Sequence, residues 1–182
     1  YGNEAEVGAA IAASGIPRDE VFVTSKLNNG FHRPDDARRA FDDTLTALRL
    51  DAIDLFLIHW PLPTRYDGDY VSTWTTLEQF AADGRARSIG VSNFQVAHLQ
   101  RLAAESSTVP AVNQIEVHPY FAQKQVQALN AEHGILTQAW SPIGGITFYR
   151  DGQHSSTLQD PVIGDIAKAH DKTPAQVMLR WH

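Results

Sequence analysis

Hydrophobic and polar residues alternate along the chain with two different periods. Short runs of consecutive apolar residues, at 21–23 and 55–58, are bounded by polar residues and turn formers, and such runs are typical of strands buried on both faces of a sheet. Between them, apolar residues recur three or four positions apart, as at Ala37, Phe41 and Leu45, which predicts helices with one apolar face. The pattern therefore predicts strands that alternate with amphipathic helices.

Five strand–helix units follow one another along the chain. The expected strands span residues 21–26, 53–59, 86–92, 112–117 and 135–140. Helices are expected from Asn3, from Pro34, around Trp74, over 95–105, around Val126, over 161–170 and from Thr173 onward. Each stretch between strands is long enough for a helical crossover, so the strands are expected to run parallel.

Two parallel architectures fit this alternation. An open doubly wound sheet needs a Gly-rich phosphate-binding turn after a strand, and none of the five strands has one. Polar or aromatic residues follow all five strands instead, as they do when every loop faces one site. This favours an α/β fold of the (β/α)8 TIM-barrel type, with about five of its eight βα units present. Residues 1–182 are then a single incomplete barrel domain, and we expect the chain to be part of a longer protein.

Composition and charge narrow the range of partners. The formal net charge is −6, which argues against a nucleic-acid partner bound through phosphate neutralisation. No apolar run approaches the length of a membrane span, so no membrane partner is expected. The chain has no cysteine, which excludes disulfides, thiolate chemistry and cysteine-based zinc sites.

The expected strand ends hold the residues with chemical potential. These residues are Lys26, His59, Ser92, Asn93, Gln114 and Trp140, joined by Tyr1 if a strand precedes it. There is no Gly-x-Ser-x-Gly elbow for acyl transfer. There is also no His-x-His pair or His-Glu-x-x-His motif for a metal, and we expect no metal. A barrel hydrolase with a metal would need three converging ligands, and only His59 is well placed.

A phenol, an ammonium and an imidazole together suit proton donation to a developing alkoxide. A lysine charge lowers the pKa of a neighbouring tyrosine, and a neutral imidazole can orient and polarise a carbonyl. The matching reaction is carbonyl reduction with hydride from a nicotinamide. Trp140 could stack on the nicotinamide ring. Ser92, Asn93 and Gln114 could bind its carboxamide, and Ser92 and Asn93 could also cap the following helix, since both roles can hold at once.

Six short segments, in order along the whole chain, resemble the signatures of the aldo-keto reductases. The segments are Tyr1-Gly2-Asn3-Glu4, Ser25-Lys26-Leu27, Leu57-Ile58-His59-Trp60-Pro61, Gly90-Val91-Ser92-Asn93-Phe94, Asn113-Gln114-Ile115-Glu116 and Ala139-Trp140-Ser141-Pro142. The resemblance is greatest to the bacterial branch that includes 2,5-diketo-D-gluconate reductases. It implies a cytoplasmic, monomeric barrel enzyme that binds NADP(H) across its C-terminal face and reduces a small aldehyde or ketone.

The resemblance also assigns roles to residues. Tyr1 would be the proton donor, Lys26 its pKa-lowering partner and His59 the residue that orients the carbonyl. Ser92, Asn93 and Gln114 would hold the carboxamide, Trp140 would stack on the nicotinamide, and the backbone of Ser141, Pro142, Ile143 and Gly144 would lie along the pyrophosphate. Trp60 would form part of the substrate wall. Asn28 stands where many relatives have a pocket tryptophan, which implies a more polar substrate opening.

Two elements of the family pattern are absent from the chain. The aspartate five residues ahead of the tyrosine would precede Tyr1, and the segment that grips the adenosine 2′-phosphate would follow His182. NAD(H) is therefore not excluded as the cofactor. A barrel that binds the nucleotide but acts as a regulatory or partner subunit is the alternative function.

Overall fold

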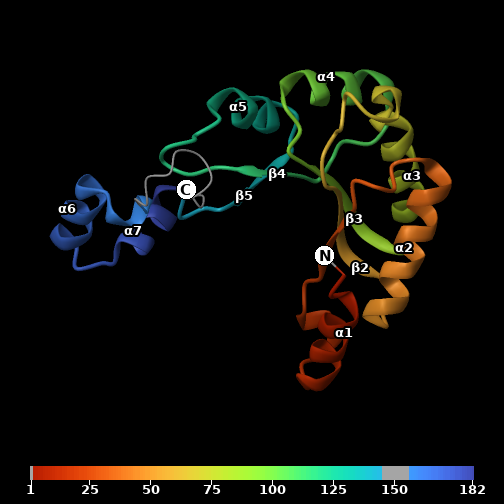
Figure 1. The fold of residues 1–182 in the computed structure, drawn as a ribbon, viewed down its shortest axis with the longest axis horizontal. Helices are drawn as coiled ribbons and strands as arrows, with labels where there is room; N and C mark the ends of the chain where they lie inside the picture. Colours follow the sequence, from red (N-terminus) through yellow and green to blue (C-terminus); the bar gives the residue numbers. More distant parts are fainter. Residues whose placement is uncertain (1, 145–155) are drawn as a thin grey trace.

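A parallel sheet of five strands organises the molecule, seen edge-on as an open arc in Figure 1. The computed structural model describes residues 2–144 and 156–182. The strands pair in the order β1-β2-β3-β4-β5 and every pairing is parallel. They are β1 (Thr24–Leu27), β2 (Ile53–Ile58), β3 (Ala86–Ser92), β4 (Val112–Glu116) and β5 (Leu136–Trp140). The predicted number, order and direction of the strands are confirmed.

The described residues form seven α-helices. They are α1 (Glu4–Ala13), α2 (Pro34–Leu48), α3 (Tyr70–Ala82), α4 (Val96–Glu105), α5 (Lys124–Glu132), α6 (Pro161–Ala169) and α7 (Pro174–Trp181). Helices α2, α3, α4 and α5 connect the strands and cover the outer side of the arc, whereas α1 lies at its N-terminal end and α6 and α7 lie beyond β5 (Figure 1). In the described part of the chain, short 3₁₀ helices at Arg18–Glu20, Tyr66–Gly68 and Thr157–Gln159 lie between the other elements. The start of α7 has every feature of a helix N-terminus that the sequence predicts. Thr173 and Gln176 form a capping box, and Pro174 between them occupies the first turn.

Aromatic packing joins α2 and α3 to the sheet. Phe41 stacks on Phe80 with ring centroids 4.2 Å apart, and Phe56 of β2 lies 4.7 Å from Phe41. All three side chains are buried, and each such burial contributes roughly 1.5–3 kcal/mol to folding. The six residues of β2 are buried throughout, as expected for a central parallel strand covered on both faces.

The first strand is shorter than predicted. It begins at Thr24 rather than at residue 21, and Phe22 is 70% exposed. The Val23 carbonyl accepts hydrogen bonds from the Asp54 and Leu55 N–H groups, but residues 21 and 22 have no ladder partner. The apolar run was therefore a poor guide to where pairing starts, because apolar character does not require a neighbouring strand.

An ion cluster closes the amino ends of the first three strands. Asp54 is 4% exposed and forms ion pairs with Arg18 (2.9 Å) and Arg87 (2.8 Å). Its carboxylate also accepts a hydrogen bond of 2.8 Å from the Val23 N–H. The buried charge therefore has partners for both oxygens, which offsets the cost of removing it from water.

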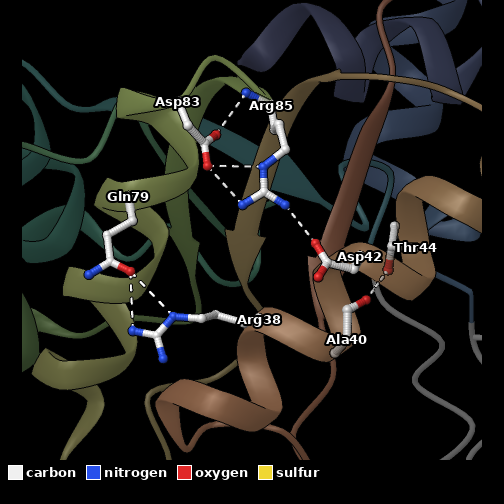
Figure 2. Close-up of polar contacts among 7 residues, drawn as sticks. All are labelled: Arg38, Ala40, Asp42, Thr44, Gln79, Asp83 and Arg85. Carbon is white, nitrogen blue, oxygen red and sulfur yellow. Dashed lines mark hydrogen bonds and ion pairs between the residues drawn. The ribbon is translucent and has the colours of Figure 1, made fainter.

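Polar bridges connect the outer surfaces of α2 and α3, as Figure 2 shows. The Arg38 guanidinium donates to Gln79, while Arg85 bonds Asp42 and Asp83. Arg85 also lies 5.3 Å from the ring centroids of Phe41 and Phe80, so it covers the edge of the aromatic cluster. The hydrogen bonds of Arg38, by contrast, are exposed to solvent, and exposed polar contacts contribute little to stability.

Candidate active site

Lys26 and His59 meet at the carboxyl ends of adjacent strands. Lys26 pairs in register with Leu57 of β2, and His59 directly follows the last residue of that strand. Both side chains line one cavity of about 150 Å³, together with Asn28. Lys26 and Asn28 also line a neighbouring cavity of about 420 Å³, which extends from Phe31 along α2, where Arg39, Thr44 and Ala47 line it. The structure thus brings together two of the three residues expected to be catalytic.

Burial lowers the pKa of both residues. Desolvation lowers the pKa of Lys26 below its ordinary value of 10.5. The pKa of His59 falls below 6.5, first through desolvation and then through the positive charge of Lys26. His59 is consequently neutral at neutral pH, so its imidazole can both donate and accept a hydrogen bond.

The expected proton donor, Tyr1, lies outside the described residues. Its neighbours are described: Gly2 lines the larger cavity beside Lys26, and Asn3 lines the smaller cavity that contains Lys26 and His59.

Asn93 links His59 to the expected cofactor residues. Its backbone is left-handed, with φ 64°, a conformation that asparagine tolerates better than most residues. The side-chain amide donates to the His59 carbonyl (2.9 Å) and to Ser92 Oγ (3.1 Å). Its oxygen accepts from Trp140 Nε1 at 2.9 Å. One side chain thereby connects the ends of β2, β3 and β5.

Ser92 and Gln114 belong to the same network. The Ser92 hydroxyl, 1% exposed, donates to the Gln114 carbonyl at 2.7 Å. The Gln114 side-chain amide donates to Gln138 Oε1 at 2.8 Å. Gln138 was missed by the sequence analysis, although it occupies the same register position on β5 as Gln114 on β4. The predicted capping role of Ser92 and Asn93 is wrong, because Gln95 caps α4 in a capping box with His98.

A tight turn follows Trp140 at the end of β5. Ser141 and Gly144 both have positive φ, 49° and 90°, and the Gly144 N–H donates to the Ser141 carbonyl. A Cβ on Gly144 would lie 2.0 Å from Thr157 Oγ1, so glycine is required there. The carbonyls inside the turn are occupied, since Ile143 O accepts from Thr157 and Pro142 O contacts His182 Nε2 at 3.0 Å.

The two expected substrate-lining residues occupy the loops after β1 and β2. Trp60 is 42% exposed, and its ring lies 6.4 Å from that of His59. Asn28 is exposed, and its side-chain oxygen accepts from the Gly30 N–H, so it also shapes its own loop. Phe31, 46% exposed at the wall of the larger cavity, was missed; an aromatic residue after Asn-Asn-Gly in a loop was the available signal.

Metal-ligating clusters and membrane-spanning helices are both absent from residues 2–144 and 156–182. No cluster of three or more His, Cys, Asp or Glu side chains there is arranged to hold a metal ion. No helix in the described part of the chain is both long and apolar enough to span a membrane.

Comparison with known proteins identifies the family. The sequence profile of the Aldo/keto reductase family matches residues 1–182. Morphine 6-dehydrogenase of Pseudomonas putida is 50% identical to 100% of this chain, which spans 62% of that protein. Methylglyoxal reductase DkgA of Yersinia pestis is 43% identical, with the same two shares.

Solved structures agree with this assignment. An aldo/keto reductase from Brucella melitensis matches with 43% identity and a TM-score of 0.89, over 100% of this chain and 66% of that one. A Bombyx mori aldo-keto reductase in complex with NADP matches with 38% identity and a TM-score of 0.87, over 98% and 62%. The chain belongs to the aldo/keto reductase family, and its sheet is five βα units of the family's (β/α)8 barrel. It spans about 62% of the length of the curated relatives named here.

Proposed function

We propose that this chain carries most of the active site of an NAD(P)H-dependent carbonyl reductase, within a single barrel domain. The observation that supports this most directly is that Lys26 and neutral His59 line one cavity at neighbouring strand ends. The names of the relatives, a methylglyoxal reductase and a morphine 6-dehydrogenase, support carbonyl–alcohol conversion. They lend no support to a regulatory or partner subunit. Small aldehydes, ketones or dicarbonyls are the proposed substrates.

The residues at the ends of β3, β4 and β5 suit a nicotinamide. When bound, the cofactor supplies the hydride. Asn93 Oδ1 and Gln114 Oε1 are amide oxygens with further acceptor capacity, as a carboxamide NH₂ requires, and Trp140 offers an aromatic face beside them. We propose NADP(H), which is bound to the Bombyx mori relative, with NAD(H) as the second candidate.

The protein's own residues would move and stabilise the proton. Tyr1 would give its phenolic proton to the substrate oxygen, and the Lys26 ammonium would stabilise the phenolate that remains. Neutral His59 would donate a hydrogen bond to the same oxygen and fix its orientation. The hydrogen bond from the Asn93 side chain to the His59 backbone carbonyl supports this role, since it ties the His59 backbone to the cofactor side of the site.

Steady-state NADPH consumption tests the proposal in the full-length protein, with methylglyoxal and an aryl aldehyde as substrates. Tyr1→Phe should lower kcat by about 10²–10⁴-fold, the usual contribution of a positioned general acid. Tyr70→Phe is the matched control, because Tyr70 loses the same hydroxyl while its ring stays packed on Phe94. Equal turnover in Tyr1→Phe and wild type would remove Tyr1 from the mechanism.

A further inference from the structure

Two loops flank the candidate active site, and no strand pairing joins them. The first loop, residues 28–33, carries Asn28 and Phe31 at the wall of the larger cavity. The second loop, residues 59–69, begins with His59 and Trp60. The β1–β2 ladder ends at Leu27 and Ile58, just before both loops. Beyond those residues, side-chain contacts rather than a strand ladder hold the two loops relative to each other.

Tyr66 of the second loop makes those contacts. Its hydroxyl donates a 2.9 Å hydrogen bond to the Asn29 carbonyl of the first loop. Its ring stacks on His32, with centroids 5.3 Å apart and planes 10° from parallel. The guanidinium groups of Arg33 and Arg65, one from each loop, lie 6.0 and 5.8 Å from its centroid. We call the His32–Tyr66 pair and the Tyr66–Asn29 hydrogen bond the loop clamp.

His32 is fixed from its other side by α3. It is 2% exposed, and Thr73 Oγ1 donates to its carbonyl at 2.8 Å. Its buried Nε2 has no hydrogen-bond partner in the described part of the chain, so stacking and burial hold that edge of the ring. Burial, and next the charge of Arg65, lower the pKa of His32 to about 4. The ring is therefore neutral at neutral pH and adds no cation beside the two arginines.

The second loop needs such restraint because its backbone is strained. Leu62, Tyr66 and Asp67 have φ of 47°, 52° and 58°. Each such residue costs on the order of 1 kcal/mol or more and persists only where surrounding contacts impose it. A second contact, from Arg101 to the Gly68 carbonyl at 2.7 Å, holds the far end of the loop. The clamp holds the part nearer the site.

We propose that His32 and Tyr66 are positioning residues that select substrates by size. Neither lines the two cavities at Lys26. They act by holding the first loop, whose Asn28 lines the cavity at Lys26, at a fixed distance from the second loop, which begins with His59 on the same cavity, and so limit the width of that cavity. This inference rests on the proposed carbonyl reductase function and adds how that site distinguishes compact from bulky carbonyl substrates.

Substrate discrimination in the full-length protein tests the inference. The ratio of kcat/KM for methylglyoxal to kcat/KM for a bulky aryl ketone should fall about tenfold in Tyr66→Leu. The fall should come mainly from a lower KM for the ketone, because small displacements near a reacting centre have large effects. Tyr66→Phe keeps the stacked ring but loses the Asn29 hydrogen bond, so a smaller change is expected. Thr76→Val is the control, because Thr76 loses a hydroxyl that bonds only the Ser72 carbonyl within α3, and it should leave the ratio unchanged.

Hydrogen–deuterium exchange gives a readout that needs no activity. Amides of residues 28–33 and 61–69 should exchange faster in Tyr66→Leu, and those of β2 should not. Unchanged exchange in both loops would show that there is no clamp, and looser loops with an unchanged substrate ratio would show that the clamp does not select substrates. If Tyr66→Leu does not fold, Tyr66→Phe decides both points. If the wild type reduces no carbonyl, the proposed function and the selection by size both fail, but the exchange rates still decide whether the clamp exists.

Discussion

An ionisable residue lies at each end of strand β2, and the surroundings of the two residues differ. Asp54, near the amino end, is enclosed by Arg18, Arg87 and the Val23 N–H. His59, just beyond the carboxyl end, lines a cavity next to Lys26. The same buried strand therefore holds a fully paired charge at one end and an accessible titratable ring at the other.

The physical causes of the two low pKa values differ. Burial raises the pKa of Asp54, but the Val23 hydrogen bond and the arginine charges outweigh it, so the carboxylate stays ionised. For His59, burial and the Lys26 charge act in the same direction, and the ring stays neutral. In barrels of this type, residues at the amino ends of strands serve stability, and residues at the carboxyl ends serve chemistry.

The largest effect is expected from Asp54→Ala. The free energy of unfolding should fall by about 2–3 kcal/mol, less than for a fully buried pair because Arg18 and Arg87 reach solvent. Urea denaturation measures this, and kcat per folded molecule should not change. The stabilisation by Asp54 is present above its unfolded pKa of 3.8 and is lost as pH falls through the lower folded value. The stability of the variant should accordingly depend less on pH in that acidic range. Lower kcat with unchanged stability would break the comparison between the two ends.

A smaller effect, on titration, is expected from Lys26→Met. Removal of the ammonium should raise the pKa of His59 while leaving it below 6.5, because burial is the larger cause. NMR titration of the histidine ring signals measures this shift. His98 is the control, since burial alone lowers its pKa and Lys26 should not affect it. Identical His59 titrations in variant and wild type would mean that the two residues are not electrostatically coupled.

The smallest effect is expected on the outer surface, away from both ends of β2. Arg38→Ala removes only exposed hydrogen bonds, to Gln79 and Asp35, and should change the unfolding free energy by about 0.5 kcal/mol or less. Arg85→Ala also uncovers Phe41 and Phe80 and should cost about 1 kcal/mol. Thermal denaturation of the two variants gives the comparison, and equal losses would show that the aromatic contact adds nothing.

The sequence predicted the strands, and the position of Lys26 and His59 at neighbouring strand ends, because both follow from local patterns. A buried run followed by Lys26 or His59 is visible without any structure, and parallel pairing then brings the two residues together. The start of β1 was wrong, since the apolar residues at 21 and 22 find no partner strand. The His32–Tyr66 contact was missed because stacking between two irregular loops leaves no period in the sequence. The role of Tyr1 stays a prediction, because that residue lies outside the described part of the chain.

The strictly sequential strand order has a consequence for how the protein is made. From β2 onward, each strand pairs with the one synthesised just before it, as Leu55 does with Thr24 and Leu136 with Val112. A newly emerged unit at the ribosome therefore docks on an existing sheet edge and need not wait for a distant segment. The edge that accepts each new unit is exposed until that unit arrives, so pauses in translation fall most safely after a complete strand–helix unit.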